Sequence, residues 1–311
     1  MNRTLIIGSR GSKLALFQAE QAKARLLEAN PSIDVRIEII KTTGDVKSDP
    51  LTVIGGKGVF TKELEDALID QRIDIAVHSL KDLPTIVPPQ LTIGAICERE
   101  DPRDALVLRR DSNDASATLD GLPGQAIVGT SSQRRFTQLI ALRPDVIIKD
   151  LRGNVDTRLR KLDEGQYDAL ILAAAGLKRL GLADRISVAI SPQQMLPAVG
   201  QGAVAIEVRG DDETSLNAVS SLDHYSTRLA CLAERSFLRA LGGGCQLPIA
   251  AHGILEGDEL ALDGLVASQD GKQIVRNTIS GIAADAELLG TQLAERLISL
   301  GANSLLQNSR T

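Results

Sequence analysis

A cysteine stands directly after three glycines in the segment LGGGCQLP, residues 241–248, and the whole chain has only three cysteines. Glycines weaken helix and strand propensity, so the segment predicts a turn or loop that carries the Cys245 thiol. A thiolate is a nucleophile and can hold a group covalently. An isolated cysteine is also commonly a small buried hydrophobic residue, and Cys245 taken alone leaves both interpretations open.

Two charged side chains end an apolar stretch in the segment AVHSLKDLP, residues 76–84. Lys81 and Asp82 stand at the predicted carboxyl end of a strand, immediately before Leu-Pro. They could form a surface ion pair in a turn, which is worth about 0–1 kcal/mol. In a site rich in arginines, however, Asp82 would be a lone carboxylate, able to stabilise a positive charge that develops during a reaction.

Basic residues gather at two predicted junctions between a strand and a helix, GTSSQRR (129–135) and LRGNVDTR (151–158). The amides and the dipole at a helix N-terminus attract anions, whereas arginines in a first turn oppose the stability of the helix itself. Surface ion pairs are the alternative, but the repeated pattern favours binding of carboxylate or phosphate. The candidate residues are Ser132, Arg134, Arg135, Arg152 and Arg158.

Weaker signals of the same kind are GSRGSK (8–13), with Arg10 and Ser12, and the glycine-rich basic segment GGKGVFTKEL (55–64). Their glycine spacing does not match a nucleotide-binding loop. Residues 132–161 hold eight basic and three acidic side chains, a charge of +5 in a chain whose net charge is −5. Aromatic residues total 2%, so stacking platforms for nucleic acid are not expected, and a local anion site is favoured.

The elements that must position these residues alternate between strands and amphipathic helices. TLIIGS, VRIEII, DIAVHSL and LTIGAI predict a first set of strands, and ALVL, AIVGTSS, VIIKDL, DALILAAAGL and ISVAI predict a second set. This βαβ pattern predicts two α/β lobes with parallel or mixed sheets. From residue 249 onward, strand pairs with polar turns and a final helix predict a small C-terminal α+β domain.

Length and composition fit a multidomain globular protein of 311 residues with aliphatic cores. We expect no signal peptide, no membrane span and no metal site, because long apolar runs and metal-ligand spacings are missing from the sequence. A cytoplasmic location is therefore predicted, or the plastid stroma if the source is photosynthetic and a transit peptide has been removed. We also expect a monomer that binds neither nucleic acid nor membranes.

The chain closely resembles the porphobilinogen deaminase family over nearly its whole length. The resemblance rests on the linked motifs GSRGSKLAL, GGKGVFTKEL, DIAVHSLKDLP, CEREDPRDAL, GTSSQRR, LRGNVDTRL, AAAGLKRLG, LPAVGQGA and GGGCQLP. Enzymes of this family, also called hydroxymethylbilane synthases, join four porphobilinogen units into the linear tetrapyrrole hydroxymethylbilane and release ammonia. They build it on a covalently held dipyrromethane primer.

The resemblance implies roles for individual residues. Cys245 would carry the dipyrromethane cofactor through a thioether, and Asp82 would stabilise the azafulvene cation that forms as ammonia leaves. The cofactor would also contact Lys81, Ser132, Arg134, Arg135, Arg152 and Arg158. The substrate would contact Arg10, Ser12, Gln18, Arg179 and Gln201. Gln133 stands where the family pattern has an apolar residue, and HYSTR around His224 also departs from that pattern; neither position has one of these roles.

The same resemblance implies two lobes with the topology of periplasmic solute-binding proteins, residues 1–98 with 198–220 and residues 99–197, and a cofactor-bearing domain, residues 221–311. Two other classes of protein remain as alternatives. A non-catalytic two-lobed anion-binding protein would explain the arginines but neither Asp82 nor Cys245. A cysteine hydrolase that pairs Cys245 with His78 or His252 lacks a recognisable nucleophile motif.

Overall fold

The computed structural model describes residues 4–43, 60–110, 118–244 and 247–307. The chain divides into two compact units, residues 1–100 with 203–228 and residues 101–202 with 229–311. The division after residue 228, where the chain passes from unit 1 to unit 2, falls within helix α9 (Tyr225–Ala240). The three-domain division expected from the family resemblance stays a prediction.

Unit 1 is built on a five-stranded sheet in the order β2-β1-β3-β10-β4. Strands β1, β2 and β3 are parallel, whereas β10 runs antiparallel to both of its neighbours. The strands are β1 (Thr4–Ser9), β2 (Asp34–Ile39), β3 (Ile75–Ser79), β4 (Leu91–Ile96) and β10 (Val204–Arg209). The helices are α1 (Lys13–Ala29), α4 (Lys62–Ile69) and α8 (Glu213–Val219), with the 3₁₀ helices η1 (Leu80–Asp82) and η3 (Ser220–Leu222).

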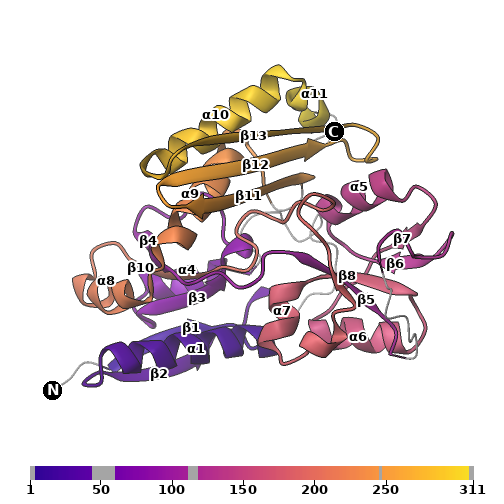
Figure 1. Cartoon of the computed structure of the whole chain (residues 1–311). Coiled ribbons are helices and arrows are strands. Elements are labelled where there is room, and N and C mark those ends of the chain that lie inside the picture. Colours follow the sequence, from indigo (N-terminus) through magenta and orange to yellow (C-terminus); the bar gives the residue numbers. More distant parts are fainter. Residues whose placement is uncertain (1–3, 44–59, 111–117, 245–246, 308–311) are drawn as a thin grey trace. The chain divides into compact units, whose positions relative to one another are not determined.

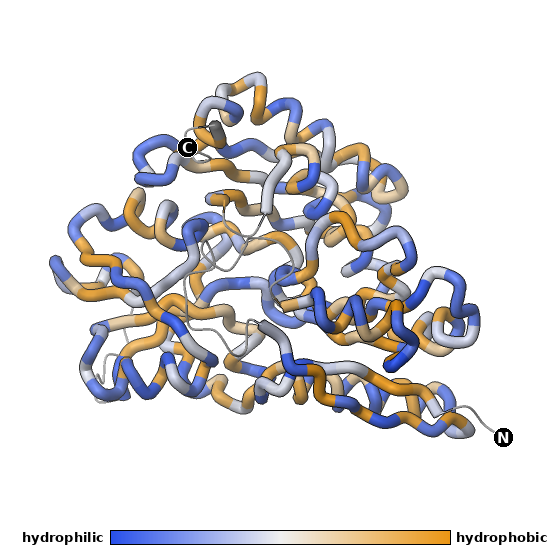
Figure 2. The backbone as a smooth tube through the Cα atoms, turned by 180° about the vertical axis from the view of Figure 1, so that it is seen from behind, coloured by the Kyte–Doolittle hydropathy of each residue, from blue (hydrophilic) through white to orange (hydrophobic). Residues whose placement is uncertain are grey.

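Helix α1 shows how the sequence builds this unit. Ser12 caps the helix, because its hydroxyl accepts a hydrogen bond from the Ala15 amide at 3.3 Å. Small and aliphatic residues at helical spacing, such as Ala19 and Leu26, are fully buried and belong to the same core cluster as Ile7 of β1. Figure 2 shows hydrophobic and hydrophilic residues alternating along the helices, as expected for helices that pack one face on a sheet and expose the other.

Unit 2 contains a second five-stranded sheet, in the order β7-β6-β8-β5-β9. Strands β6, β7 and β8 are parallel, and β5 is antiparallel to β8 and β9. The strands are β5 (Asp104–Leu108), β6 (Ile127–Gly129), β7 (Ile147–Lys149), β8 (Ala169–Ala173) and β9 (Val188–Ala189). The helices are α5 (Gln133–Leu142), α6 (Val155–Asp163) and α7 (Ala174–Arg179), with η2 (Ala183–Arg185).

The C-terminal part of unit 2 is an antiparallel sheet, β11-β12-β13, with helices on one face (Figure 1). Its elements are β11 (Ile249–Glu256), β12 (Glu259–Ala267), β13 (Ile274–Ile282), η4 (Ala283–Asp285), α10 (Ala286–Ser299) and α11 (Ala302–Gln307). Phe237 of α9, Leu262 of β12 and Leu293 of α10 are fully buried in one core cluster. The predicted fold class, two α/β lobes with mixed sheets and a small C-terminal α+β domain, is confirmed.

One predicted strand is too long. The segment DALILAAAGL was expected to be a strand throughout, but β8 ends at Ala173 and helix α7 begins at Ala174. The local sequence ALILAAAGL is apolar without interruption, so it holds no periodic signal for the change of structure. Tertiary packing places the change there: Ala174, Ala175 and Leu177 are all buried.

In each of the two mixed sheets, the carboxyl ends of the three parallel strands lie at one edge of the sheet. Ligands of open α/β sheets bind beyond this edge. In unit 1, Arg10 and Ser12 follow β1, and Lys81 and Asp82 follow β3. In unit 2, the residues after the three strands are Ser132, Arg134 and Arg135 after β6, Arg152 and Arg158 after β7, and Arg179 after β8. The topology thus gathers the predicted site residues of each unit.

Candidate active site

Asp82 ends the short helix η1, which follows strand β3 directly. Its side chain is partly buried. Within the part of the chain that the structure describes, no ion pair or side-chain hydrogen bond involves this carboxylate. The turn beneath it is well anchored, because the Leu80 amide donates to the Ala203 carbonyl at 3.0 Å and the Leu83 amide donates to Leu80 at 3.2 Å. The backbone turn that carries Asp82 is therefore fixed, and no described side chain neutralises its carboxylate.

Gln18 supports the same segment from helix α1. It is buried, and its amide nitrogen donates to the Ser79 hydroxyl at 3.0 Å. Ser79 is the last residue of β3 and stands just before η1. Gln18 was predicted to contact substrate, and that role stays a prediction. In this geometry it fixes the end of the strand that carries Lys81 and Asp82.

The other predicted residues of unit 1 lie at the carboxyl end of β1. Arg10 is partly buried and places its guanidinium carbon 4.2 Å from the ring centre of Phe60, a cation–π contact. Ser12 is partly buried and uses its hydroxyl as the N-cap of α1. An arginine and a helix N-terminus at one strand end suit a carboxylate ligand.

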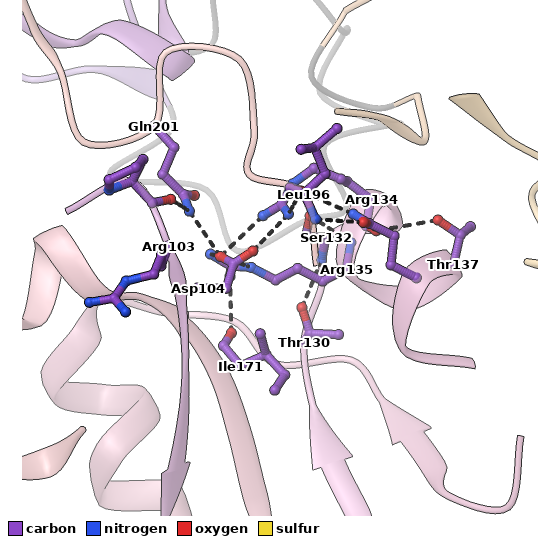
Figure 3. A network of polar contacts seen from close by, with 12 residues as sticks. Arg103, Asp104, Thr130, Ser132, Arg134, Arg135, Thr137, Ile171, Leu196 and Gln201 are labelled. Carbon is purple, nitrogen blue, oxygen red and sulfur yellow. Dashed lines mark hydrogen bonds and ion pairs between the residues drawn. The ribbon is translucent and has the colours of Figure 1, made fainter. Parts of the chain in front are cut away.

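In unit 2, a buried carboxylate lies between two arginines (Figure 3). Asp104, the first residue of β5, is completely buried. Arg134 contacts it at 2.7 Å (Nη1–Oδ2), and Arg135 contacts it at 2.8 Å (Nη2–Oδ1). Gln201 donates to the same carboxylate at 3.0 Å. Sequence reasoning did not single out Asp104, although it lies within the motif CEREDPRDAL.

The two guanidinium groups leave this network with a surplus positive charge, since one carboxylate faces two arginines. Burial by itself would raise the pKa of Asp104, but the charges of Arg134 and Arg135 outweigh it and hold that pKa well below its usual range. Burial lowers the pKa of Arg135, and the neighbouring Arg134 charge adds to the effect, against the opposing pull of Asp104. A further anion would therefore stabilise the charged arginines.

Arg134 also holds a buried donor that the network leaves unused. Its Nε atom is buried and has no hydrogen-bond partner among the residues that the structure describes. Its Nη1 atom donates to the Leu196 carbonyl at 2.7 Å, and Arg135 donates to the Ile171 carbonyl at 3.0 Å. Buried donors normally find acceptors, so the unused N–H is a place where a ligand oxygen would bind.

Hydrogen bonds connect the loop between β9 and β10 to this network. Gln201, which is buried, also donates to the Pro102 carbonyl at 2.7 Å. Arg179 of α7 donates to the Gly202 carbonyl at 2.7 Å. Both residues were predicted to contact substrate, and these roles stay predictions. The hydrogen bonds show that they also fix the conformation of the loop 197–202.

The loops that follow β6 and β7 are joined by one hydroxyl. Ser131 accepts a hydrogen bond from the Leu151 amide at 3.0 Å and donates to the carbonyl of the same residue. The next residue, Arg152, is partly buried and pairs with Asp150 at 2.8 Å. Ser131 therefore sets the spacing between the two predicted anion-binding junctions.

A helix follows each of the two junctions, as predicted. Ser132 is the N-cap of α5, and its hydroxyl faces the Arg135 amide at 3.5 Å. Asn154 is the N-cap residue of α6, but its side chain makes no capping hydrogen bond. Arg158 of α6 instead donates to the Gly153 carbonyl at 2.7 Å, which closes the turn in front of the helix.

Cys245 lies outside the described residues, and the structure places only the segments on either side of it. Helix α9 precedes it, and strand β11 follows it. Glu234 of α9 is completely buried and accepts two backbone amides, from Gly200 at 2.7 Å and from Gly253 at 2.8 Å. One carboxylate thus links the helix before Cys245, the loop that carries Gln201, and the strand after Cys245.

The other two cysteines and His78 have packing roles. Cys97 and Cys231 are buried, as expected of small core residues. His78 of β3 is also buried, and its Nε2 atom lies 2.9 Å from Glu207 of β10, which is fully buried. This pair was not found from the sequence, because the two residues are far apart in the chain. His252, on β11, is partly buried.

Comparison with known proteins gives a consistent result. The family model "Porphobilinogen deaminase, dipyromethane cofactor binding domain" matches residues 5–217, and "Porphobilinogen deaminase, C-terminal domain" matches residues 228–299. The chain is 52% identical to the porphobilinogen deaminase of Roseiflexus sp. (strain RS-1), over 98% of this chain and 99% of that protein. It is 53% identical to the porphobilinogen deaminase of Synechococcus sp. (strain RCC307), over 97% and 95%.

Among solved structures, the chain is similar to the VFT2 domain of BvgS from Bordetella pertussis. The sequence identity is 17%, the TM-score is 0.41, and the match covers 70% of this chain and 85% of that one. Of the described helices, none is both long enough and apolar enough to cross a membrane.

Proposed function

The chain belongs to the porphobilinogen deaminase family and has the activity of a hydroxymethylbilane synthase with a dipyrromethane cofactor; we propose that Asp82 is its catalytic carboxylate and that Cys245 holds the cofactor. The observation that carries the proposal for Asp82 is its unneutralised carboxylate on an anchored turn at the carboxyl end of β3. The proposal for Cys245 rests on the family resemblance of GGGCQLP.

The residues of unit 2 fit a ligand that carries carboxylates. Two buried arginines face one buried aspartate, and the Arg134 Nε atom is an unused buried donor. Acetate and propionate side chains supply oxygens for such donors. We propose that Ser132, Arg134, Arg135, Arg152 and Arg158 hold the cofactor carboxylates, and that Lys81 also contacts the cofactor. When bound, the dipyrromethane supplies the pyrrole to which the first substrate unit is joined.

The proposed role of Asp82 follows from the charge that the reaction creates on the substrate. The C–N bond of the protonated aminomethyl group of porphobilinogen breaks, and ammonia leaves with the electron pair. Positive charge then passes to the pyrrole ring. A carboxylate on an anchored turn, with no partner to give up, stabilises this charge and lowers the barrier.

The substrate also carries two carboxylates on each pyrrole. Arg10 and Ser12 stand at the end of β1 and are proposed to bind them, because they combine a cation with a helix N-terminus. Three further residues are proposed to affect substrate binding through the groups that they hydrogen-bond. Gln18 holds Ser79, Arg179 holds Gly202, and Gln201 holds Asp104.

The test is the mass of the intact protein. Protein purified from cells should be heavier than its sequence mass by two linked pyrrole units, and Cys245→Ser should fold, carry no adduct and make no product, because an alcohol is a far poorer nucleophile than a thiolate. Arg135→Leu should also yield protein without the cofactor. Arg160→Leu is the control, since Arg160 is exposed and its ion pair among the described residues is with Glu164. An unmodified wild-type protein with full activity would contradict the proposal for Cys245.

We further propose that the protein is a cytoplasmic monomer. The described cysteines, Cys97 and Cys231, are buried thiols, as expected of a protein in a reducing compartment. Light scattering of the purified protein at micromolar concentration measures the oligomeric state, and a mass of twice 33.1 kDa would contradict the monomer.

A further inference from the structure

The turn between β12 and β13, residues 268–273, lies against helix α5, as Figure 1 shows. The turn is closed by its own hydrogen bonds: the Ser268 amide donates to the Gln273 carbonyl at 2.8 Å, and the Gly271 amide donates to Ser268 at 3.0 Å. The Ser268 hydroxyl donates to the Asp270 carboxylate at 2.6 Å. This turn is therefore a well-defined structure rather than a loose connection.

Gly271 is the residue that meets α5. Its φ is +70°, a left-handed conformation that favours glycine. A Cβ atom at this position would lie 2.3 Å from the Ile140 side chain and 2.7 Å from the Thr137 carbonyl oxygen. Because ordinary contacts begin near 3.4 Å, the helix or the turn would have to move by about 1 Å to admit a methyl group.

A hydrogen bond makes a second connection at the start of the helix. Gln133 is the first residue of α5, and its amide nitrogen donates to the Gln269 carbonyl at 2.6 Å. The contact at Thr137 lies one turn further along, and the Thr137 hydroxyl donates to the Arg134 carbonyl at 3.3 Å. The turn thus touches α5 on both sides of Arg134 and Arg135.

We propose that the turn 268–273 is a positioning element for the two arginines, with Gly271 and Gln133 as its positioning residues. The inference rests on the proposed function, in which these arginines bind the cofactor carboxylates. An arginine binds a carboxylate through two parallel hydrogen bonds, so its affinity depends on the position of the guanidinium plane. The C-terminal part of the chain then has two functions: it carries Cys245 and it fixes the helix that receives the cofactor.

The test compares two glycines with the same backbone conformation. Gly257, in the turn between β11 and β12, has a φ of +61°, and nothing lies within 4 Å of the position of its Cβ atom. Gly257→Ala therefore carries the same backbone strain as Gly271→Ala without the contact to α5. Three properties are measured well below the melting temperature of both variants. They are the hydrogen exchange of the α5 amides, the fraction of protein that carries the cofactor, and the kinetic constants kcat and KM.

We expect Gly257→Ala to resemble the wild type in all three measurements. Gly271→Ala should expose the α5 amides to faster exchange, lower the loaded fraction, and reduce kcat by roughly ten- to a hundredfold, the cost of a misplacement of about 1 Å. Gln133→Ala should show the same pattern with a loss of about three- to tenfold. Adding Ile140→Ala to Gly271→Ala should restore part of the loss, because it removes the nearest clash.

If Gly271→Ala does not fold, Gln133→Ala and the Ile140→Ala, Gly271→Ala double variant decide the question. The inference is overturned if the folded variants load the cofactor and turn over within about twofold of Gly257→Ala. Arg135→Leu, measured in parallel, separates the two hypotheses. Normal loading of Arg135→Leu overturns the proposed function and this inference with it, whereas failed loading of Arg135→Leu beside normal loading of Gly271→Ala overturns the inference alone.

Discussion

At the scale of single residues, Asp82 differs from Asp104 in what surrounds its charge. Asp104 is compensated by two arginines, whereas the described residues offer Asp82 no ion pair. A neutralised carboxylate contributes to stability, and an uncompensated one is available to a substrate. Amide substitution should therefore affect the two aspartates differently. At Asp82 it should reduce catalysis, and at Asp104 it should reduce stability.

Asp82→Asn should fold, retain its cofactor and lose nearly all turnover. A carboxylate about 4 Å from a developing cation contributes about 4 kcal/mol at an effective dielectric constant near 20, or about a thousandfold in rate. Because the interaction grows as the charge develops, the loss should appear in kcat and leave KM nearly unchanged. Steady-state assays with porphobilinogen measure both constants.

The control for this substitution is Asp211→Asn, which removes an exposed carboxylate from the same unit. It should leave kcat unchanged. If Asp82→Asn keeps kcat within about tenfold of the wild type while it carries its cofactor, the stabilisation is worth only about 1.4 kcal/mol. Asp82 would then not be the residue that stabilises the cation.

Asp104→Asn should destabilise the protein by about 3–5 kcal/mol at neutral pH, since it leaves two buried guanidinium groups without a counter-ion. The pKa of Asp104 is lower in the folded chain than its ordinary value of about 3.9. Its stabilisation is therefore complete above about pH 4 and is lost as the pH falls below that value. Urea unfolding between pH 7 and pH 2.5 measures the effect.

The variant should show a flatter fall in unfolding free energy below pH 4 than the wild type. The slope should not vanish, because hydrogen bonds from Arg103 and Lys178 also lower the pKa of Asp101, against the effect of its burial. Identical slopes for the wild type and Asp104→Asn would show that Asp104 is not ionised in the folded protein.

The position of Asp82 at the end of a strand could be predicted from the sequence, whereas the environment of Asp104 could not. Asp82 follows a recognisable strand and precedes a proline, so the local sequence places it at a strand end. Asp104 opens a strand, and its partners are Arg134, Arg135 and Gln201, which lie about 30 and 97 residues further along the chain. A carboxylate that is buried by distant arginines has no local signature, because its environment is created by the tertiary fold.

At the scale of elements, helix α9 contacts two other segments through one side chain. Glu234 accepts amides from Gly200 and from Gly253 of β11. Apolar residues recur at helical spacing in α9, but this pattern gives no role to an acidic residue within the helix, since it identifies buried positions only by their apolar side chains. The buried glutamate is explained by the two backbone donors that it satisfies.

Glu234→Gln should lower the free energy of unfolding by about 2–3 kcal/mol, because the new amide group turns an N–H donor toward one of the two backbone donors. Hydrogen exchange should become faster at the Gly200 and Gly253 amides in particular. Glu287→Gln is the control, since Glu287 is exposed and pairs with Arg239. Equal stability and exchange for both variants would show that the two amides find other acceptors.

At the scale of the whole molecule, unit 2 joins a mixed α/β sheet to the C-terminal antiparallel sheet. Among the described residues, the contacts between them include the turn 268–273 on α5, hydrogen bonds from Arg276 to the Pro192 and Gln193 carbonyls, and a small core cluster with Leu196 and Leu265. Sequence periodicity predicted both sheets separately. It could not predict the connections, because alternation shows that a residue is buried but not which element buries it.

These connections imply that the two sheets of unit 2 unfold together. Leu265 of β12 is 3% exposed and packs in a cluster with Leu196, Ala250 and Ala267. Leu265→Ala should cost about 2–5 kcal/mol, the usual range for a buried leucine. Leu196 also accepts the Arg134 hydrogen bond through its carbonyl. The substitution should therefore also destabilise the sheet that contains β8.

Native-state hydrogen exchange tests this, since it reports the opening free energy of each strand. Leu265→Ala should lower that free energy by equal amounts in β8 and in β12. Ile254→Ala, at a position 48% exposed on β11, should change neither strand. If the opening free energy falls only in β11, β12 and β13, the C-terminal sheet opens on its own. The contacts on α5 and Leu196 would then join two independently stable parts.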